Sequence, residues 1–352
     1  MKLVYVIEKM SGIGGMERIL TDKMNWLCRQ DYIELTLLLV WKDAQPIEFA
    51  LDPRIHIERL EIPYIKGGLT YPLALYRYNK TIKRLQPDIT VFCWVMGAFL
   101  AAYGHHVGKT IFESHLAATR MRHRWLIDKM QQKVNKVVTL TSQDACNFTQ
   151  AFSVSVIPNF TMLEIHRKPS YEVKHCVALG RFVHQKNYPR MIAIWRQVVQ
   201  RFPEWTLDIY GDGEDRAVIE QCIQRAHIQD NVILHGYTKE VVNAYTSGSI
   251  YLMTSRMEGF PLVLIEAMAC GLPVVAFDCP YGPRDAIKNG VTGYLIPYDD
   301  DKAYIEALSQ LMGNVSLRKQ MGTAATAEIG CYSYESIMQQ WLSLFQEIVL
   351  SC

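Results

Sequence analysis

The sequence lacks the features of a secreted, membrane-spanning or metal-binding protein. Its longest apolar run, residues 89–104, is interrupted by Gly97 and is shorter than the roughly 20 residues that a transmembrane helix needs. The nine cysteines are scattered and include no C-x-x-C pair, which argues against a zinc site and against a disulfide framework. These absences predict a cytoplasmic protein without a transmembrane segment.

The chain also lacks an excess of one charge. It carries 37 Lys and Arg against 35 Asp and Glu in 352 residues, so its composition gives no reason to expect a nucleic-acid partner. The N-terminal run 1–8 is too short for a secretion signal and is typical of a first strand. The length exceeds what one hydrophobic core usually holds, which predicts two domains.

The stretch 250–276 has the pattern of a strand, a turn, a helix and a second strand. Residues 250–254 are apolar, and Glu258-Gly-Phe-Pro261 then breaks the pattern before helical spacing begins. A glycine turn that leads into a helix offers unpaired N–H groups and a positive dipole end, which suit a phosphate. Glu266 lies about two turns into that helix and could accept hydrogen bonds from a diol such as ribose. An ordinary βαβ unit with two solvated glutamates is the alternative.

A second turn between a strand and a helix carries two cations. The strand 176–179 leads into Gly180-Arg181, and Lys186 follows before the next helical stretch. An Arg offers a fork for phosphate oxygens and a Lys a mobile point charge, so the pair suits a leaving diphosphate. Two exposed surface cations would give the same pattern. No D-x-D set is placed to bridge a diphosphate through a metal.

The first half of the chain begins with a glycine-rich turn. Strand 3–7 leads into Gly12-x-Gly14-Gly15, but Glu17 stands where a dinucleotide fingerprint has its third glycine, which disfavours a nicotinamide or flavin enzyme. The turn is either open to a ligand or purely structural. Strand 110–113 ends in Ser114-His115, at the carboxyl end where open α/β sheets bind ligands. A lone histidine is usually structural, so this residue alone does not predict catalysis.

Together these stretches resemble the motifs of retaining glycosyltransferases of the GT-B fold, specifically family 4. The matching elements are E-x7-E (Glu258 and Glu266), G-R-x-x-x-x-K-G (Gly180 to Asn187), G-G-x-E (Gly14 to Glu17) and E-x-H (Glu113 to His115). Asn187 replaces the commoner glycine and Gln185 the commoner glutamate, while both cations are present. The resemblance covers nearly the whole chain and is most specific over 180–297.

The resemblance implies an α/β protein with two Rossmann-like domains, whose parallel sheets face an interdomain cleft. We expect an acceptor-binding domain at 1–165 and a nucleotide-sugar-binding domain at 166–332. A final helix within 333–352 is expected to pack back on the first domain.

The resemblance also implies a reaction. A hexosyl or N-acetylhexosaminyl group is transferred from a nucleotide sugar, with a UDP-sugar as the first choice, and the anomeric configuration is retained. The acceptor is a glycan or a polyprenyl-pyrophosphate-linked glycan of surface polysaccharide biosynthesis, such as that of lipopolysaccharide. The nucleotide sugar is a co-substrate, and neither a cofactor nor a metal is expected.

The implied site residues come from both halves of the chain. Catalytic roles are implied for His115, Arg181, Lys186 and Glu258. Donor binding is implied for Gly14, Gly15, Arg181, Lys186, Tyr237, Glu258, Gly259, Phe260, Pro261, Leu262 and Glu266. Two other functions stay open, a phosphorylase or epimerase of the same fold and a non-catalytic nucleotide-sugar-binding protein.

The stretch 120–136 is basic, with Trp125 among its cations. A basic helix with an aromatic residue can lie on an anionic membrane surface or face a pyrophosphate-bearing acceptor. The interpretation as a membrane contact predicts a peripheral location at the inner membrane face. A solvated helix face explains the pattern equally well.

Overall fold

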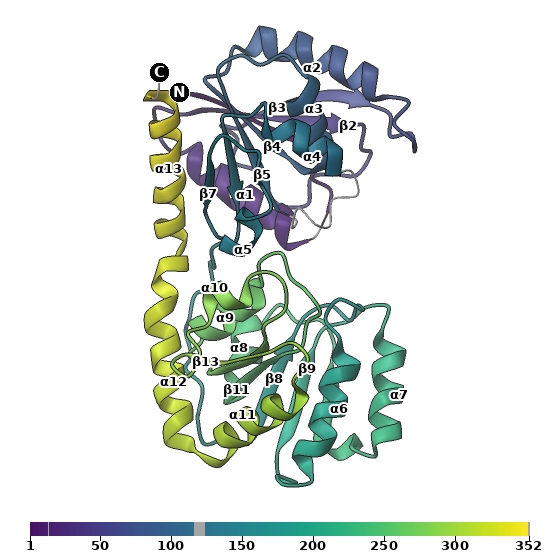
Figure 1. Cartoon of the computed structure of the whole chain (residues 1–352), viewed down its shortest axis with the longest axis vertical. Helices are drawn as coiled ribbons and strands as arrows, with labels where there is room; N and C mark the ends of the chain where they lie inside the picture. Colours follow the sequence, from purple (N-terminus) through teal and green to yellow (C-terminus); the bar gives the residue numbers. More distant parts are fainter. Residues whose placement is uncertain (13, 116–123, 351–352) are drawn as a thin grey trace. The chain divides into compact units, whose positions relative to one another are not determined.

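The computed structural model describes residues 1–12, 14–115 and 124–350 (Figure 1). The chain divides into two compact units, Met1–Asn159 with Glu335–Cys352, and Phe160–Tyr334. Each unit contains one parallel sheet, so the fold class expected from the sequence is confirmed. Within the described part of the chain, no helix combines the length and the apolar character required to cross a bilayer.

The first unit alternates strands and helices. Its strands are β1 (Lys2–Ile7), β2 (Glu34–Trp41), β3 (His56–Ile62), β4 (Ile89–Cys93), β5 (Lys109–Ser114), β6 (Lys136–Thr139) and β7 (Val154–Val156). Its helices are α1 (Gly15–Leu27), α2 (Tyr71–Leu85), α3 (Trp94–Tyr103), α4 (Arg124–Gln131), α5 (Ser142–Ala145) and, from the end of the chain, α13 (Tyr334–Leu350).

The sheet of the first unit has the strand order β3-β2-β1-β4-β5-β6-β7. Helices α2, α3 and α4 pack on one face, through core residues that include Tyr78, Met96 and Leu126. On the other face, Lys23 of α1 lies over the rings of Tyr5 and Trp341. Covering both faces explains why β2 and β4 are nearly continuous apolar runs. The strand order reverses between β1 and β4, which is where ligands bind in such sheets.

The second unit repeats this plan. Its strands are β8 (His175–Leu179), β9 (Thr206–Tyr210), β10 (Val232–His235), β11 (Ile250–Met253), β12 (Val274–Phe277) and β13 (Gly293–Ile296). Its helices are α6 (Tyr188–Val199), α7 (Arg216–Ala226), η2 (Gln229–Asn231), α8 (Val241–Thr246), α9 (Leu262–Ala269), α10 (Pro283–Ala286), α11 (Asp301–Gly313), α12 (Val315–Glu328) and η3 (Ile329–Tyr332).

The sheet of the second unit has the order β10-β9-β8-β11-β12-β13, which reverses between β8 and β11. Its core packs α6, α7 and α11 against one face, with Trp195, Ile219 and Tyr304 fully buried. Because parallel strands point the same way, the turns after β8 and β11 lie side by side at one edge of this sheet.

The chain passes between the units at Asn159–Phe160 and at Tyr334–Glu335, close to the boundaries expected at 165–166 and 332–333. The ring of Phe160 lies 4.8 Å from that of Tyr334, and Thr161 forms a β-bridge with Ser333. Residues 160–165 therefore belong with the second unit. The rest of α13 belongs to the first unit, where Lys136 Nζ lies 3.2 Å from Glu347 Oε1.

The helix α6 begins after a residue in the left-handed backbone region. Asn187 is buried, has φ 56° and ψ 42°, and its side chain makes no capping hydrogen bond. Asparagine tolerates this conformation better than most residues with a side chain. The backbone therefore explains why asparagine can stand here in place of glycine.

Replacing Asn187 tests this conformational requirement. We expect Asn187→Val to have a free energy of unfolding about 1–2 kcal/mol below that of Asn187→Gly, because a β-branched residue is strained in the left-handed region. Urea unfolding of the two variants measures the difference. Equal stabilities would contradict the requirement, since both substitutions remove the same amide group.

Candidate active site

The turn after β8 carries the two cations predicted to bind a diphosphate. Arg181 is exposed, and Lys186 is 16% exposed at its side chain. Gly211, in the turn after β9, packs so closely that a Cβ atom there would lie 2.0 Å from the carbonyl oxygen of Gly180. The glycine at 211 therefore lets the neighbouring turn support the one that holds the cations.

The turn after β11 brings Glu258 to Lys186. Glu258 is buried, and its Oε1 atom lies 2.9 Å from Lys186 Nζ. Gln185 donates a hydrogen bond from Nε2 to the carbonyl oxygen of Met257 at 3.0 Å, and the Arg256 amide donates to the carbonyl oxygen of Gln185 at 2.8 Å. The two turns are thus joined by an ion pair, a side-chain hydrogen bond and a backbone hydrogen bond.

Gln185 stands where the related motif more often has glutamate. Its Nε2 atom also lies 3.4 Å from Glu258 Oε2. A glutamate at this position would place a second carboxylate beside Glu258, and like charges repel at such distances. The glutamine therefore avoids a second negative charge next to the buried Glu258 carboxylate.

Glu266 lies within α9 and is held by a buried tyrosine. Tyr245 donates a hydrogen bond from its hydroxyl to Glu266 Oε2 at 2.8 Å. Burial and the nearby Glu266 carboxylate raise the pKa of Tyr245 well above its usual value, so the tyrosine stays a hydrogen-bond donor. Tyr245 orients Glu266, and the apolar pattern of α8 gave no sign of that role.

The other donor-binding candidates of this unit lie at the same edge or beyond it. Gly259, Phe260 and Pro261 form the turn before α9, and Leu262 begins the helix. The Leu262 amide already donates to the carbonyl oxygen of Phe260 at 3.0 Å, so in this state it does not point freely at a ligand. Tyr237 follows β10 and is 79% exposed.

A buried serine adds a group that the sequence analysis did not single out. A small hollow at the ends of β8 and β11 is lined by Lys186, Thr254 and Ser255, among others. The Ser255 hydroxyl is buried and finds no hydrogen-bond partner among the residues that the structure describes. The sequence did offer one indication of this serine, since it stands just after β11, at the edge of the sheet where ligands bind.

In the first unit, the carboxylate of Glu17 lies against the glycine turn that precedes α1. Gly14 is the N-cap of α1 and Gly15 its first residue. A Cβ atom on Gly12 or Gly14 would lie 2.2 Å or 2.7 Å from a carboxylate oxygen of Glu17. Glu17 therefore folds back over the turn and lies at the positive end of the α1 dipole. The structural explanation of this turn fits the contacts, and a phosphate there would have to displace Glu17.

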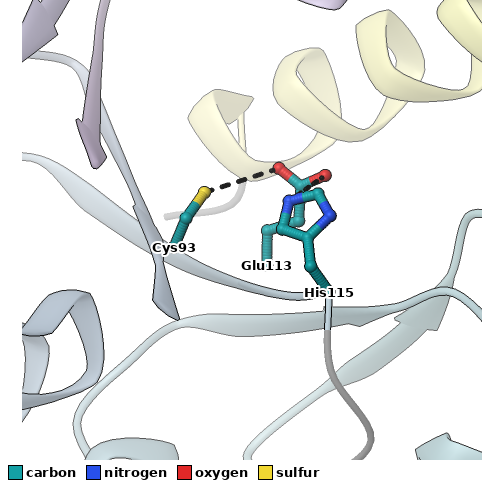
Figure 2. A group of neighbouring side chains, drawn as sticks. All are labelled: Cys93, Glu113 and His115. Atoms are coloured by element: carbon teal, nitrogen blue, oxygen red, sulfur yellow. Dashed lines mark hydrogen bonds and ion pairs between the residues drawn. The ribbon is translucent and has the colours of Figure 1, made fainter. Parts of the chain in front are cut away.

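His115 lies directly after β5, beside Glu113 and Cys93 (Figure 2). Its Nε2 atom is 3.3 Å from Glu113 Oε1 but is not aligned for a hydrogen bond to any described residue. The Cys93 thiol lies 4.0 Å from Glu113 Oε2. The three side chains come from adjacent positions, because Cys93 pairs with Glu113 in the sheet register.

These three side chains are also close enough together to suggest a metal site. Their ligand atoms all lie within 4.8 Å of one another. However, the Lys23 ammonium donates to Glu113, and a divalent cation would be repelled by it. Burial, together with Glu113, raises the pKa of Cys93 well above its usual value, whereas metal binding requires a thiolate. The donor set therefore does not fit a divalent metal.

The basic stretch 120–136 is only partly described, since residues 120–123 lie outside the described residues. Trp125 is 58% exposed on α4. The Lys129 ammonium lies 4.0 Å from the centroid of the Tyr103 ring, and Lys136 is buried in β6 and paired with Glu347. Lys136 is therefore not available to a membrane surface, while α4 exposes an aromatic side chain.

Comparisons with known proteins identify the family. Residues 165–328 match the family model for glycosyl transferases group 1. The chain is 34% identical over 367 residues to the amylovoran biosynthesis glycosyltransferase AmsD of Erwinia amylovora, a match that covers 97% of this chain and 98% of that protein.

Two solved structures show the same fold. The lipopolysaccharide outer core galactosyltransferase WaaB, in its apo form, has a TM-score of 0.82 at 21% identity, over 99% of this chain and 100% of its own. The Anabaena protein Alr3699/HepE, in complex with UDP and glucose, has a TM-score of 0.75 at 18% identity, over 99% and 100%. These likenesses show the GT-B fold, and the whole-length match to AmsD shows that this chain belongs to the family of glycosyl transferases group 1.

Proposed function

We propose that the protein is a retaining glycosyltransferase of family 4. It transfers a hexosyl or N-acetylhexosaminyl group from a nucleotide sugar to a glycan or lipid-linked glycan in surface polysaccharide biosynthesis. The observation that carries this proposal is the cluster of Arg181, Lys186 and Glu258 where the strand order of the second sheet reverses. A UDP-sugar is the first choice of donor, since the structurally similar HepE was solved with UDP and glucose bound.

The cations stabilise the leaving group. As the bond between the anomeric carbon and the phosphate oxygen breaks, negative charge grows on the diphosphate. Arg181 is exposed and makes no ion pair with any residue in the described ranges, so its guanidinium is available to two phosphate oxygens. Lys186 adds a second positive charge from the same turn.

The ion pair between Lys186 and Glu258 defines the state before the donor binds. A buried carboxylate needs a cation, and Lys186 supplies it at 2.9 Å. When a donor arrives, its diphosphate can share Lys186, and its sugar hydroxyls can donate to Glu258. Glu266, already oriented by Tyr245, has the chemistry to accept hydrogen bonds from the ribose diol.

Retention is proposed to occur by reaction on the front face of the sugar. A double displacement would need a carboxylate nucleophile, and Glu258 is instead paired with Lys186. In the front-face reaction, the acceptor hydroxyl oxygen bonds to the anomeric carbon as the diphosphate leaves with the bonding electrons. The hydroxyl proton passes to a phosphate oxygen. His115 is assigned to the transferred sugar near its reacting end, and Gly14 and Gly15 to close approach of the donor.

Arg181→Ala tests the assignment of the leaving-group site. A screen of UDP- and GDP-sugars should raise the melting temperature of the wild type, because a ligand that binds only the folded state stabilises it. In Arg181→Ala we expect release of the nucleoside diphosphate to slow by about 100-fold or more, without loss of the fold. Arg196→Ala, an exposed arginine of α6, is the matched control. Near-normal turnover by Arg181→Ala would refute the assignment.

We further propose that transfer does not require a metal. Arg181 and Lys186 supply the positive charge that a bridging metal would otherwise provide. Incubation with EDTA followed by dialysis should leave the rate within about twofold of that of the untreated enzyme, since the charge that stabilises the leaving group belongs to the protein. Loss of activity that Mn²⁺ restores would contradict this proposal.

Finally, we propose that the protein is cytoplasmic and contacts the inner membrane face through the basic stretch 120–136, apart from Lys136, which is paired with Glu347. The exposed ring of Trp125 on α4 supports this contact. Flotation with anionic liposomes should recover the wild type, and reversing the charges of Arg120, Arg122 and Arg124 should abolish recovery. Neutral liposomes are the control, because each basic residue near an anionic surface contributes about 1 kcal/mol. Equal flotation of the variant would rule the contact out.

A further inference from the structure

Helix α1 carries a lysine that is almost fully enclosed. Lys23 is 1% exposed, and removing an ammonium from water is strongly unfavourable unless it is paired. Its Nζ atom donates a hydrogen bond to Glu113 Oε1. It also lies 4.0 Å from the centroid of the Trp341 ring and 5.4 Å from that of Tyr5. The Glu113 carboxylate and the faces of the Trp341 and Tyr5 rings therefore stabilise the Lys23 ammonium.

The carboxylate that Lys23 contacts is the one beside His115. Lys23 Nζ and His115 Nε2 both approach the same oxygen atom, Oε1 of Glu113, and Nε2 stands 3.3 Å away without an aligned hydrogen bond. The other oxygen, Oε2, faces the Cys93 thiol. Lys23 thus occupies the position from which Glu113 would otherwise bind the imidazole.

The contact of Lys23 with Glu113 Oε1 also determines the charge of this carboxylate. Burial by itself would raise the pKa of Glu113, but Lys23 and His115 outweigh it and lower the pKa to about 2. The carboxylate is therefore ionised at neutral pH. The remaining titratable neighbours, Cys93 and Tyr5, have pKa values raised well above their usual ranges, first by burial, so both stay neutral. Lys23 is the cation that balances Glu113.

We propose that Lys23 is a positioning residue for His115, acting through the shared Oε1 atom of Glu113. The proposal rests on the function above, in which His115 lies at the transferred sugar. With Lys23 in place, the His115 imidazole lies beside Glu113 without donating an aligned hydrogen bond to it. Without Lys23, the uncompensated carboxylate would take the Nε2–H bond and hold the ring in its protonated form.

The last helix completes this arrangement. Trp341 of α13 is buried and places its ring face over Lys23 Nζ, and a desolvated ammonium is attracted to the face of an aromatic ring. The return of α13 to the first unit therefore does more than cover the sheet. It closes the side of the Lys23 pocket that would otherwise admit water and weaken the pair with Glu113.

Lys23→Met tests the proposal through the titration of His115. The long-range ¹H–¹⁵N spectrum of the imidazole, assigned by its absence in His115→Ala, reports both the tautomer and the titration midpoint. We expect the midpoint in Lys23→Met to rise by about one unit or more, because the neighbouring carboxylate loses its cation. An unchanged midpoint and tautomer would overturn the proposal.

Lys136→Met is the matched control. Lys136 is also a buried lysine of the first unit that pairs with a glutamate, in its case Glu347 of α13 at 3.2 Å, and neither residue belongs to the Glu113 cluster. The control should leave the His115 midpoint unchanged. A shift equal to that of Lys23→Met would mean that general loosening of the unit is responsible, which would also overturn the proposal.

A second variant covers the case in which Lys23→Met does not fold. Trp341→Leu keeps the ion pair but removes the ring over Lys23, so the His115 midpoint should shift in the same direction by a smaller amount. An unchanged midpoint in this variant would contradict the role of α13 and of the enclosed charge.

Activity separates this inference from the proposed function. In Lys23→Met we expect kcat to fall by about tenfold or more with KM for the donor nearly unchanged, since misplacing a group near the reaction costs rate rather than binding. If the wild type transfers no sugar, the proposed function fails while the spectra still report on Lys23. If transfer occurs and Lys23→Met has a normal kcat, the inference fails alone.

Discussion

The ion pair between Lys186 and Glu258 is the contact on which the proposed donor site of the second unit depends. It joins the turns after β8 and β11, the two strands between which the sheet order reverses. Both turns leave the sheet at its carboxyl edge, because all its strands are parallel. A buried carboxylate without this cation would have to bind a proton or open to water, and either change would remove the carboxylate that is proposed to face the sugar.

Each unit thus contains a buried glutamate that pairs with a lysine, and the two lysines differ in access to solvent. Lys186 is 16% exposed at its side chain, so a diphosphate can reach it and share its charge. Lys23 is 1% exposed beneath Trp341, so a ligand cannot reach it. The pair of Lys186 and Glu258 suits binding, because the lysine can change partners when a ligand arrives. The pair of Lys23 and Glu113 suits orientation, because the lysine stays in place.

Much of the candidate site could be predicted because its residues lie in short, local patterns. Arg181 and Lys186 share one turn, and Glu258 and Glu266 flank the start of one helix, so each group was visible within about ten residues of sequence.

Lys23 was missed because its partners Glu113 and Trp341 are far away in the chain. A signal existed, since Lys23 lies at helical spacing with the buried residues Leu20 and Leu27. Such a lysine is usually expected at the surface, where its charge is solvated.

The alternation of strands and helices, the two-unit plan and the identity of the groups at each turn can be predicted from the sequence, because periodicity, glycine turns and charge are local properties. Tertiary structure decided which of these groups meet. It paired Lys186 with Glu258, placed Tyr245 on Glu266, and brought the last helix back to cover Lys23. Those contacts depend on strand order and on the burial of charge, and both are set only when distant segments pack together.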